Sequence, residues 1–339
     1  MKKYKIAALT WQIMHYYDLF NALKEDADFY LIDTNHRDWR DKRFQQLRPI
    51  PENAHFIPYY QPGKYDFAIL NVDQQVTDER LGKAKVIHDL NKEIQDIPKV
   101  FINHASPVYP ELYATQGRTF EEAEEDCRQR VRELVGDNPM IVNSYQATSK
   151  AEWGWGYPIW HGMDVNDWYD LPKEPRVFSA LSPAGIDEYY NREAMNRIFV
   201  DMEKFWGYKM YWAKQNIGIN PSWNFHEYRT YLGKSLIYLD MSFRTPMNRA
   251  RCEAMLSGCC VVQVKGAHDI ERFAKDKENM ILVDNSPKQV CQILMELLNL
   301  HYDKCVEIGQ AGKKTAMELF NRKRYREDWL TFIHNVLKI

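Results

Sequence analysis

The residues best suited to hold an anionic ligand lie in the segment 242–262, which reads SFRTPMNRARCEAMLSGCCVV. Thr245 is a favourable helix N-cap, and Pro246 suits the first helical position. Gly258 suits the left-handed residue that follows a helix. These signals predict a helix over residues 246–257, whose first turn offers free backbone N–H groups to an anion such as a phosphate.

One carboxylate on this helix is placed to act together with its first turn. Glu253 lies about 12 Å along the axis from the predicted cap, and helical side chains lean back toward the N-terminus. A strand is predicted just before the helix, at residues 235–240, so the helix begins at the carboxyl edge of a parallel sheet, where ligands bind. The segment therefore predicts a site in which the helix start meets a phosphate or sugar and Glu253 meets a diol.

Short apolar runs alternate with amphipathic stretches along the chain, which predicts parallel strands joined by helices. The first series has strands at 5–9, 29–32, 67–71, 100–103 and 140–143, and helices at 17–23, 77–94 and 119–134. The second series has strands at 176–181, 209–212, 235–240, 261–264 and 280–283, and helices at 191–205, 225–232, 246–257, 267–273, 286–298 and 302–320. The predicted fold class is α/β, with one Rossmann-like α/β/α domain over 1–162, completed by a C-terminal helix at 322–339, and a second over 163–321.

Composition narrows the class of protein. A chain of 339 residues with 45% hydrophobic content is longer than one core usually organises. A net charge of −2 argues against a dedicated nucleic-acid binder, and no segment approaches the roughly 18 consecutive apolar residues of a membrane span. Six cysteines show neither a metal-ligand spacing nor a secreted disulfide framework, so we expect a cytoplasmic protein.

One basic stretch, at residues 36–48, could hold an anion. Arg37, Arg40 and Arg43 lie in it beside an aromatic residue, a combination that suits an anionic acceptor, a lipid headgroup or a nucleic-acid backbone. Aspartates interleave with the arginines, and this pattern is also typical of a solvated surface. Both interpretations stay open from the sequence.

The second half of the segment 242–262 resembles the donor-binding motif of the retaining glycosyltransferase family 4 (glycosyl transferases group 1), whose members have the GT-B fold. In that motif a glutamate, seven residues and a second glutamate precede Ala-Met and a Gly-x-x-Val-Val turn. The residues 253–255, Gly258 and 261–262 fall in register. The resemblance implies that Glu253 holds the ribose hydroxyls of a nucleotide. Thr245 stands where the family has its first glutamate, near the reacting carbon of the sugar, so either Thr245 substitutes as a hydrogen-bonding group or the activity differs.

Further donor-site residues are implied by the same resemblance. Gly162 and Asp164 match the family's interdomain Gly-x-Asp turn. Arg192, at the start of the helix after the next strand, corresponds to a basic residue that binds the donor diphosphate, for which a guanidinium is well shaped. Lys214 is a weaker candidate, because its spacing does not distinguish it from a surface lysine. The remaining residues expected to line the donor site are Arg244, Pro246, Met247 and Asn248.

A histidine is expected on the acceptor side. His104 follows the predicted strand at 100–103, and the family commonly has a histidine here, close to the donor sugar and the acceptor. The resemblance thus implies a GT-B fold with two Rossmann-like domains facing across a cleft, and it gives His104 and Thr245 as the catalytic candidates. Residues 9–13, LTWQI, lack the glycines that family members usually have after the first strand.

The resulting hypothesis is a glycosyltransferase, of the hexosyl or pentosyl class. It would move a sugar from a nucleotide-diphosphate sugar, most simply a UDP- or GDP-sugar, to an acceptor hydroxyl, with retention of configuration. We expect no cofactor and no metal site: the motif at 26–28, DAD, precedes its strand rather than ending it. The acceptor could be a glycan, a lipid-linked sugar or a modified nucleic-acid base. The alternatives are a nucleotide-sugar-binding protein without turnover and a sugar-nucleotide epimerase.

Overall fold

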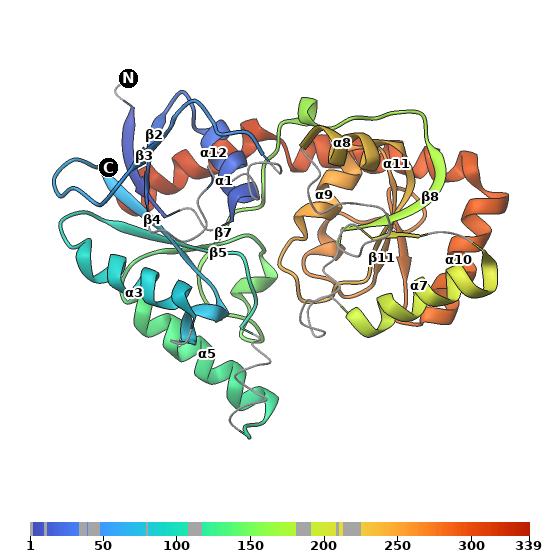
Figure 1. The fold of residues 1–339 in the computed structure, drawn as a ribbon, viewed down its shortest axis with the longest axis horizontal. Helices are drawn as coiled ribbons and strands as arrows, with labels where there is room; N and C mark the ends of the chain where they lie inside the picture. The colour runs from blue at the N-terminus through green and yellow to red at the C-terminus, as the bar shows by residue number, and fades with distance from the viewer. Residues whose placement is uncertain are drawn as a thin grey trace. The chain divides into compact units, whose positions relative to one another are not determined.

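The computed structural model describes residues 3–9, 12–33, 39, 48–78, 81–107, 117–180, 191–207, 210–212 and 225–339. These residues form two compact units (Figure 1). The first unit combines Met1–Met163 with Arg322–Ile339, and the second is Asp164–Asn321. The division falls beside the predicted boundary at residue 162, and each unit is a mixed α/β domain.

The first domain is built on a parallel sheet of seven strands in the order β3-β2-β1-β4-β5-β6-β7. The adjacent strands β4 and β5, in the middle of this sheet, are buried along their whole length, as expected for strands covered on both faces. The strands are β1 Tyr4–Ala8, β2 Ala27–Ile32, β3 Ala54–Ile57, β4 Phe67–Val72, β5 Lys99–Asn103, β6 Met140–Val142 and β7 Tyr157–Pro158.

Helices cover both faces of this sheet. Figure 1 shows α3 and α5 on one side and α1 with α12 on the other. The helix α5 is closed at its start by a capping box, in which Thr119 accepts from the backbone N–H of Glu122 and the Glu122 carboxylate accepts from that of Thr119. The bounds are α1 Ile13–Ala22, α3 Gly82–Glu93, α5 Phe120–Val135 and α12 Arg322–Phe332, with a π-helical turn at Ile333–Leu337 and 3₁₀ turns at Gln74–Thr77 and Gln146–Thr148.

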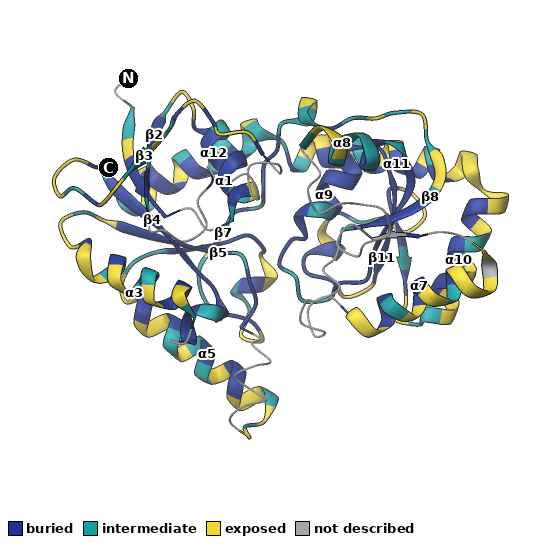
Figure 2. Cartoon of the chain, viewed as in Figure 1, coloured by how far each residue is buried: buried dark blue, intermediate teal, exposed yellow. Residues whose placement is uncertain are grey.

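The second domain has a parallel sheet of five strands in the order β12-β11-β10-β8-β9. Its strands are β8 Glu174–Ser179, β9 Tyr211–Trp212, β10 Ser235–Asp240, β11 Cys260–Val264 and β12 Ile281–Val283. Its helices are α7 Arg192–Trp206, α8 Phe225–Lys234, α9 Arg249–Leu256, α10 Pro287–Leu300 and α11 Tyr302–Leu319, with 3₁₀ turns at Val165–Asp167 and Ile270–Arg272. Figure 2 shows the buried strands of both domains and the exposed outer faces of α3, α5, α7 and α10.

Two of the predicted helices are not single α-helices in the structure. The stretch 267–273 forms only the 3₁₀ turn Ile270–Arg272, because Asp269 takes a left-handed conformation (φ 59°) that a helix cannot continue through. The predicted helix 77–94 is two elements, the 3₁₀ turn Gln74–Thr77 and the helix Gly82–Glu93. Within the described residues, no helix combines the length and the hydrophobicity that crossing a bilayer requires.

A glycine in α11 gives a test of how tightly the second domain is packed. A Cβ atom on Gly309 would lie 2.4 Å from the carbonyl oxygen of Gly258 and 3.1 Å from the backbone nitrogen of Cys260. We expect Gly309→Ala to lower the free energy of unfolding by about 1–3 kcal/mol, because overpacking against backbone outweighs the gain in helix propensity. Urea unfolding would measure this, with the exposed Lys314→Ala as control. An unchanged or higher stability of Gly309→Ala would contradict the packing argument.

Candidate functional site

The loop between β10 and α9, residues 241–248, is held by a buried carboxylate. Asp240 ends β10, and its Oδ1 accepts hydrogen bonds from the backbone N–H and the hydroxyl of Ser242 at 2.9 and 2.6 Å. Its Oδ2 accepts from Nδ2 of Asn248 at 2.9 Å, while Oδ1 of Asn248 accepts from the backbone N–H of Ala250 at 3.1 Å. The end of the strand, the loop and the start of the helix are therefore one hydrogen-bonded unit.

A buried arginine lies behind this unit. Arg251 is completely buried, and its Nη1 donates to Oε1 of Gln263 at 3.0 Å and lies 4.0 Å from Oδ2 of Asp240. Burial raises the pKa of the Asp240 carboxyl above its usual range, and the nearby charge of Arg251 opposes that rise. We did not predict these three residues. The signal for Asp240 was present, since it is a carboxylate at the end of an otherwise apolar strand.

The predicted start of α9 is wrong. Asn248 is the N-cap and the helix begins at Arg249, whereas we expected Thr245 as the cap and Pro246 as the first helical residue. Met247 has a left-handed conformation (φ 36°), so the chain cannot be helical between Pro246 and Asn248. The buried hydroxyl oxygen of Thr245 has no hydrogen-bond partner within the described part of the chain. Thr245 thus keeps a free hydroxyl in the loop instead of closing the helix.

The position of Glu253 changes accordingly. It lies five residues after the cap, about 7.5 Å along the axis, rather than the 12 Å expected. Glu253 is 2% exposed, its Oε2 accepts from the hydroxyl of Tyr228 at 2.6 Å, and its Oε1 pairs with Arg249 one turn earlier. A diol bound here would have to exchange with one of these two partners. We did not predict either partner, although the i,i+4 spacing to Arg249 was a usable signal.

The other predicted binding residues divide into four groups. Arg192 is exposed at the first position of α7. The helices α7 and α9 follow the neighbouring strands β8 and β10, so both helices begin at the same edge of the sheet. Asp164 caps the 3₁₀ turn Val165–Asp167 by accepting from the backbone N–H of Asn166 at 2.9 Å, and Gly162 lies just before the division between the units. Arg244, Pro246, Met247 and Asn248 lie together in the loop before α9. The residues Lys214, Arg37, Arg40 and Arg43 lie outside the described residues.

Three histidines meet at the carboxyl edge of the first sheet. His104 follows β5, and its ring stacks on that of His15 from α1, with the centroids 3.9 Å apart and the planes at 18°. Nδ1 of His15 lies 3.3 Å from Nδ1 of His161, whose Nε2 lies 2.8 Å from Nδ2 of Asn143. We predicted a role for His104 alone. In the described ranges, no group of His, Cys, Asp or Glu is arranged as a set of metal ligands.

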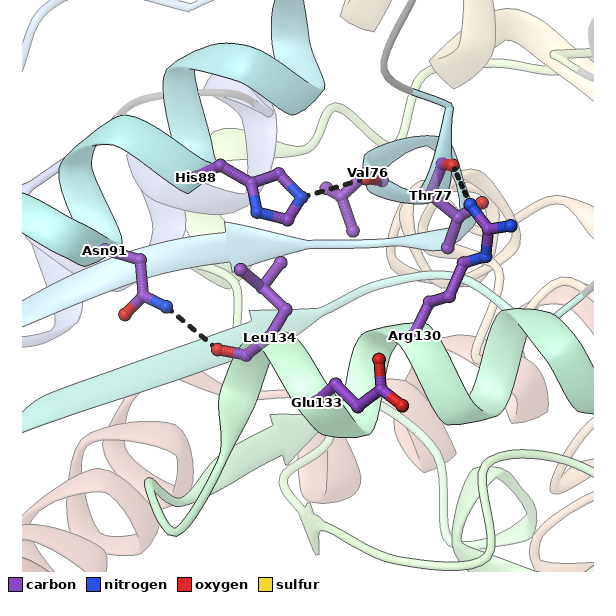
Figure 3. Close-up of a pocket in the computed structure, with 7 residues that line it drawn as sticks. All are labelled: Val76, Thr77, His88, Asn91, Arg130, Glu133 and Leu134. Carbon is purple, nitrogen blue, oxygen red and sulfur yellow. Dashed lines mark hydrogen bonds between the residues drawn. The ribbon is translucent and has the colours of Figure 1, made fainter.

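A groove of about 420 Å³ lies elsewhere in the first domain, between α3 and α5 (Figure 3). Two of its polar side chains bond to nearby backbone: Nε2 of His88 lies 3.4 Å from the carbonyl oxygen of Val76, and Nη1 of Arg130 donates to the carbonyl oxygen of Thr77 at 3.2 Å. The groove is lined by Val76, Thr77, His88, Asn91, Arg130, Glu133 and Leu134, none of which was predicted as a site residue.

The two parallel-sheet domains, with the C-terminal segment returning to the first, define the GT-B fold. The chain is similar to HepE from Anabaena, solved with UDP and glucose, with a TM-score of 0.66, 14% identity, and coverage of 98% of this chain and 100% of that one. It is also similar to sucrose-phosphate synthase from Thermosynechococcus elongatus (0.65, 12%, 99% and 100%) and to a glycosyltransferase from Rickettsia africae (0.63, 11%, 100% and 100%). No protein-family model and no curated protein matches the sequence.

Proposed function

We propose that the protein is a glycosyltransferase that moves a sugar from a nucleotide-diphosphate sugar to an acceptor hydroxyl. The observation that carries the proposal is the buried carboxylate of Glu253, directed toward the start of α9 beside a loop that the side chain of Asp240 holds in place. A carboxylate binds a ribose diol well, and a helix start binds phosphate. The likeness of the fold to solved glycosyltransferases supports the same assignment.

The proposal divides the donor among three parts of the second domain. Glu253 would hold the ribose, while Arg192 and the N–H groups at the start of α9 would hold the diphosphate. Thr245, whose buried hydroxyl has no partner in the described ranges, would bond to the sugar. We take UDP-glucose as the first donor to test, because one structure of HepE contains UDP-glucose.

The proposed sugar transfer places negative charge on the departing diphosphate, and the residues around it would stabilise that charge. The bond from the anomeric carbon to the diphosphate breaks, a bond to the acceptor oxygen forms, and the acceptor proton passes to the departing phosphate oxygen. Arg192 and the helix N-terminus would stabilise the departing diphosphate, which is the larger part of catalysis in such a reaction. We propose that the first domain supplies the acceptor side with His104, and that the configuration is retained by attack on the same face of the sugar.

The first experiment is incubation of the protein with UDP-, GDP-, ADP- and dTDP-sugars without acceptor. We expect one donor to raise the unfolding temperature and to release nucleoside diphosphate slowly. A ligand at a hundred times its Kd that binds only the folded state adds about 2.7 kcal/mol, which is easily measured. Stabilisation without release would favour the binding protein, and a new sugar nucleotide would favour the epimerase. No response to any nucleotide would contradict the assignment of Glu253 and Arg192.

A substitution at Thr245 separates binding from turnover. We expect Thr245→Ala to lower kcat for the cleaved donor by about tenfold, because a hydrogen bond to the reacting sugar strengthens in the transition state. The Kd for the nucleoside diphosphate should stay unchanged, since that ligand has no sugar to contact. Thr230→Ala, on the surface of α8, is the matched control. A rise in the nucleotide Kd with kcat unchanged would contradict this assignment.

A further inference from the structure

The backbone that carries His104 is pinned on its C-terminal side. Oδ1 of Asn103 accepts from the backbone N–H of Ala105 at 2.9 Å, and the indole N–H of Trp153 donates to the carbonyl oxygen of Ala105 at 2.6 Å. Asn103 and Trp153 are buried, whereas His104 between these fixed points is half-buried. The turn therefore fixes the Cα of His104 and leaves its ring orientation to be set by neighbouring side chains.

The ring of His15 restricts that orientation. His15 and His104 stack nearly parallel at 3.9 Å between centroids, which leaves the His104 ring little freedom to rotate. His15 is itself anchored, because its Nδ1 lies 3.3 Å from Nδ1 of His161. A hydrogen bond between two Nδ1 atoms needs a proton on one ring and a lone pair on the other, so it also fixes a tautomer.

His161 is the most firmly held member of the set. It is 2% exposed, and its Nε2 lies 2.8 Å from the amide of the buried Asn143. The guanidinium of Arg324 donates to the carbonyl oxygen of Trp160 at 2.9 Å and also to that of His161. A chain of contacts thus leads from the buried Asn143 and from Arg324 to His161, then to His15, and finally to the half-buried ring of His104.

We propose that His15 and His161 are positioning residues that hold the His104 ring ready for the reacting sugar. His15 would act through the ring stack and His161 through the Nδ1 to Nδ1 hydrogen bond. The kinetic part of this inference rests on the proposed function, whereas the geometric part does not. Mispositioning of a reacting group by about 1 Å can cost about a hundredfold in rate, so the effect should be large.

Two pairs of variants test the two contacts separately. His15→Phe keeps a stacking ring but loses the hydrogen bond to His161, and His15→Ala loses both contacts. His161→Asn keeps an amide near the Nδ1 position, and His161→Ala removes it. With UDP-glucose as donor, we expect the alanine variants to lose about ten- to a hundredfold in kcat, with the Kd for UDP unchanged. His161→Asn should stay within a few-fold of the wild type, and His15→Phe, which keeps the ring stack but lacks the hydrogen bond to His161, should fall between the wild type and His15→Ala. His88→Ala, a histidine of the same domain outside the set, is the control.

Imidazole NMR gives a readout that does not need turnover. A ring stacked at 3.9 Å shields the carbon-bound protons of His104, so these signals should move downfield in His15→Ala and return in His15→Phe. Unmoved His104 signals in His15→Ala, or equal kcat in an alanine variant and its conservative partner, would overturn the proposal. If the wild type cleaves no nucleotide sugar, the proposed function fails, and the NMR result alone decides whether His15 positions His104.

Discussion

Replacing Asp240 by alanine is expected to lower the free energy of unfolding of the second domain by about 3–5 kcal/mol. The substitution leaves Arg251 completely buried without its nearest carboxylate, and it removes the acceptors for Ser242 and Asn248. Each buried donor left unsatisfied has its own cost. Urea unfolding followed by fluorescence would measure the loss.

Two further variants show whether the burial of the charges causes the loss of stability expected in Asp240→Ala. Asp284 makes an ion pair with Lys265 at 2.9 Å on the surface of the same domain, and Asp284→Ala should cost about 1 kcal/mol or less. The double variant of Asp240→Leu with Arg251→Met replaces the buried charges with apolar groups and should be less destabilised than Asp240→Ala alone. Equal losses for Asp240→Ala and Asp284→Ala would show that the carboxylate does not organise this loop.

Glu253→Gln is expected to weaken the binding of the donor nucleotide by roughly ten- to a hundredfold, because hydrogen bonds to a charged acceptor contribute about 1.5–3 kcal/mol. The amide keeps the shape of the carboxylate, and Tyr228 can still donate to its oxygen, so the fold should persist. Isothermal titration with UDP would give the Kd. Because ribose is bound equally in the ground and transition states, kcat should change much less than the Kd.

The matched control is Glu271→Gln, at an exposed carboxylate of the same domain. It should leave the Kd for UDP unchanged. If both variants bind UDP as the wild type does, the ribose is not bound at Glu253. If Glu253→Gln binds normally but is strongly destabilised, the carboxylate serves only as the partner of Arg249.

The sequence predicted most of the fold because its signals are local. The strand at 235–240 and the capped helix at 119–134 have strong apolar patterns, and the structure confirms both within a residue. The strands Ala54–Ile57 and Tyr157–Pro158 were missed, since they are short, lie at the edges of the sheet and are only partly buried. Edge strands receive much of their stability from pairing, which no local pattern reports.

The candidate site was harder to predict, because its contacts are made by distant parts of the chain. Thr245 and Asn248 are both good N-caps by residue type. Asn248 takes that place because its amide also donates to Asp240, a contact that only the folded sheet supplies. Likewise, His15 and His161 lie 146 residues apart and meet because α1, which follows β1, and the segment after β7 both begin at the carboxyl edge of the same parallel sheet.

The return of the C-terminal helix to the first domain has a consequence for biosynthesis. The helix α12 packs against α1, Arg326 makes a bidentate pair with Asp26 at 2.5 and 2.6 Å, and Phe332 packs edge-on against Tyr157. A ribosome therefore delivers the last layer of the first domain only after the whole of the second has been made. The domain whose synthesis begins first is therefore completed last. Until α12 has been synthesised, the apolar face of α1 that it covers stays exposed, and chaperones would recognise this face.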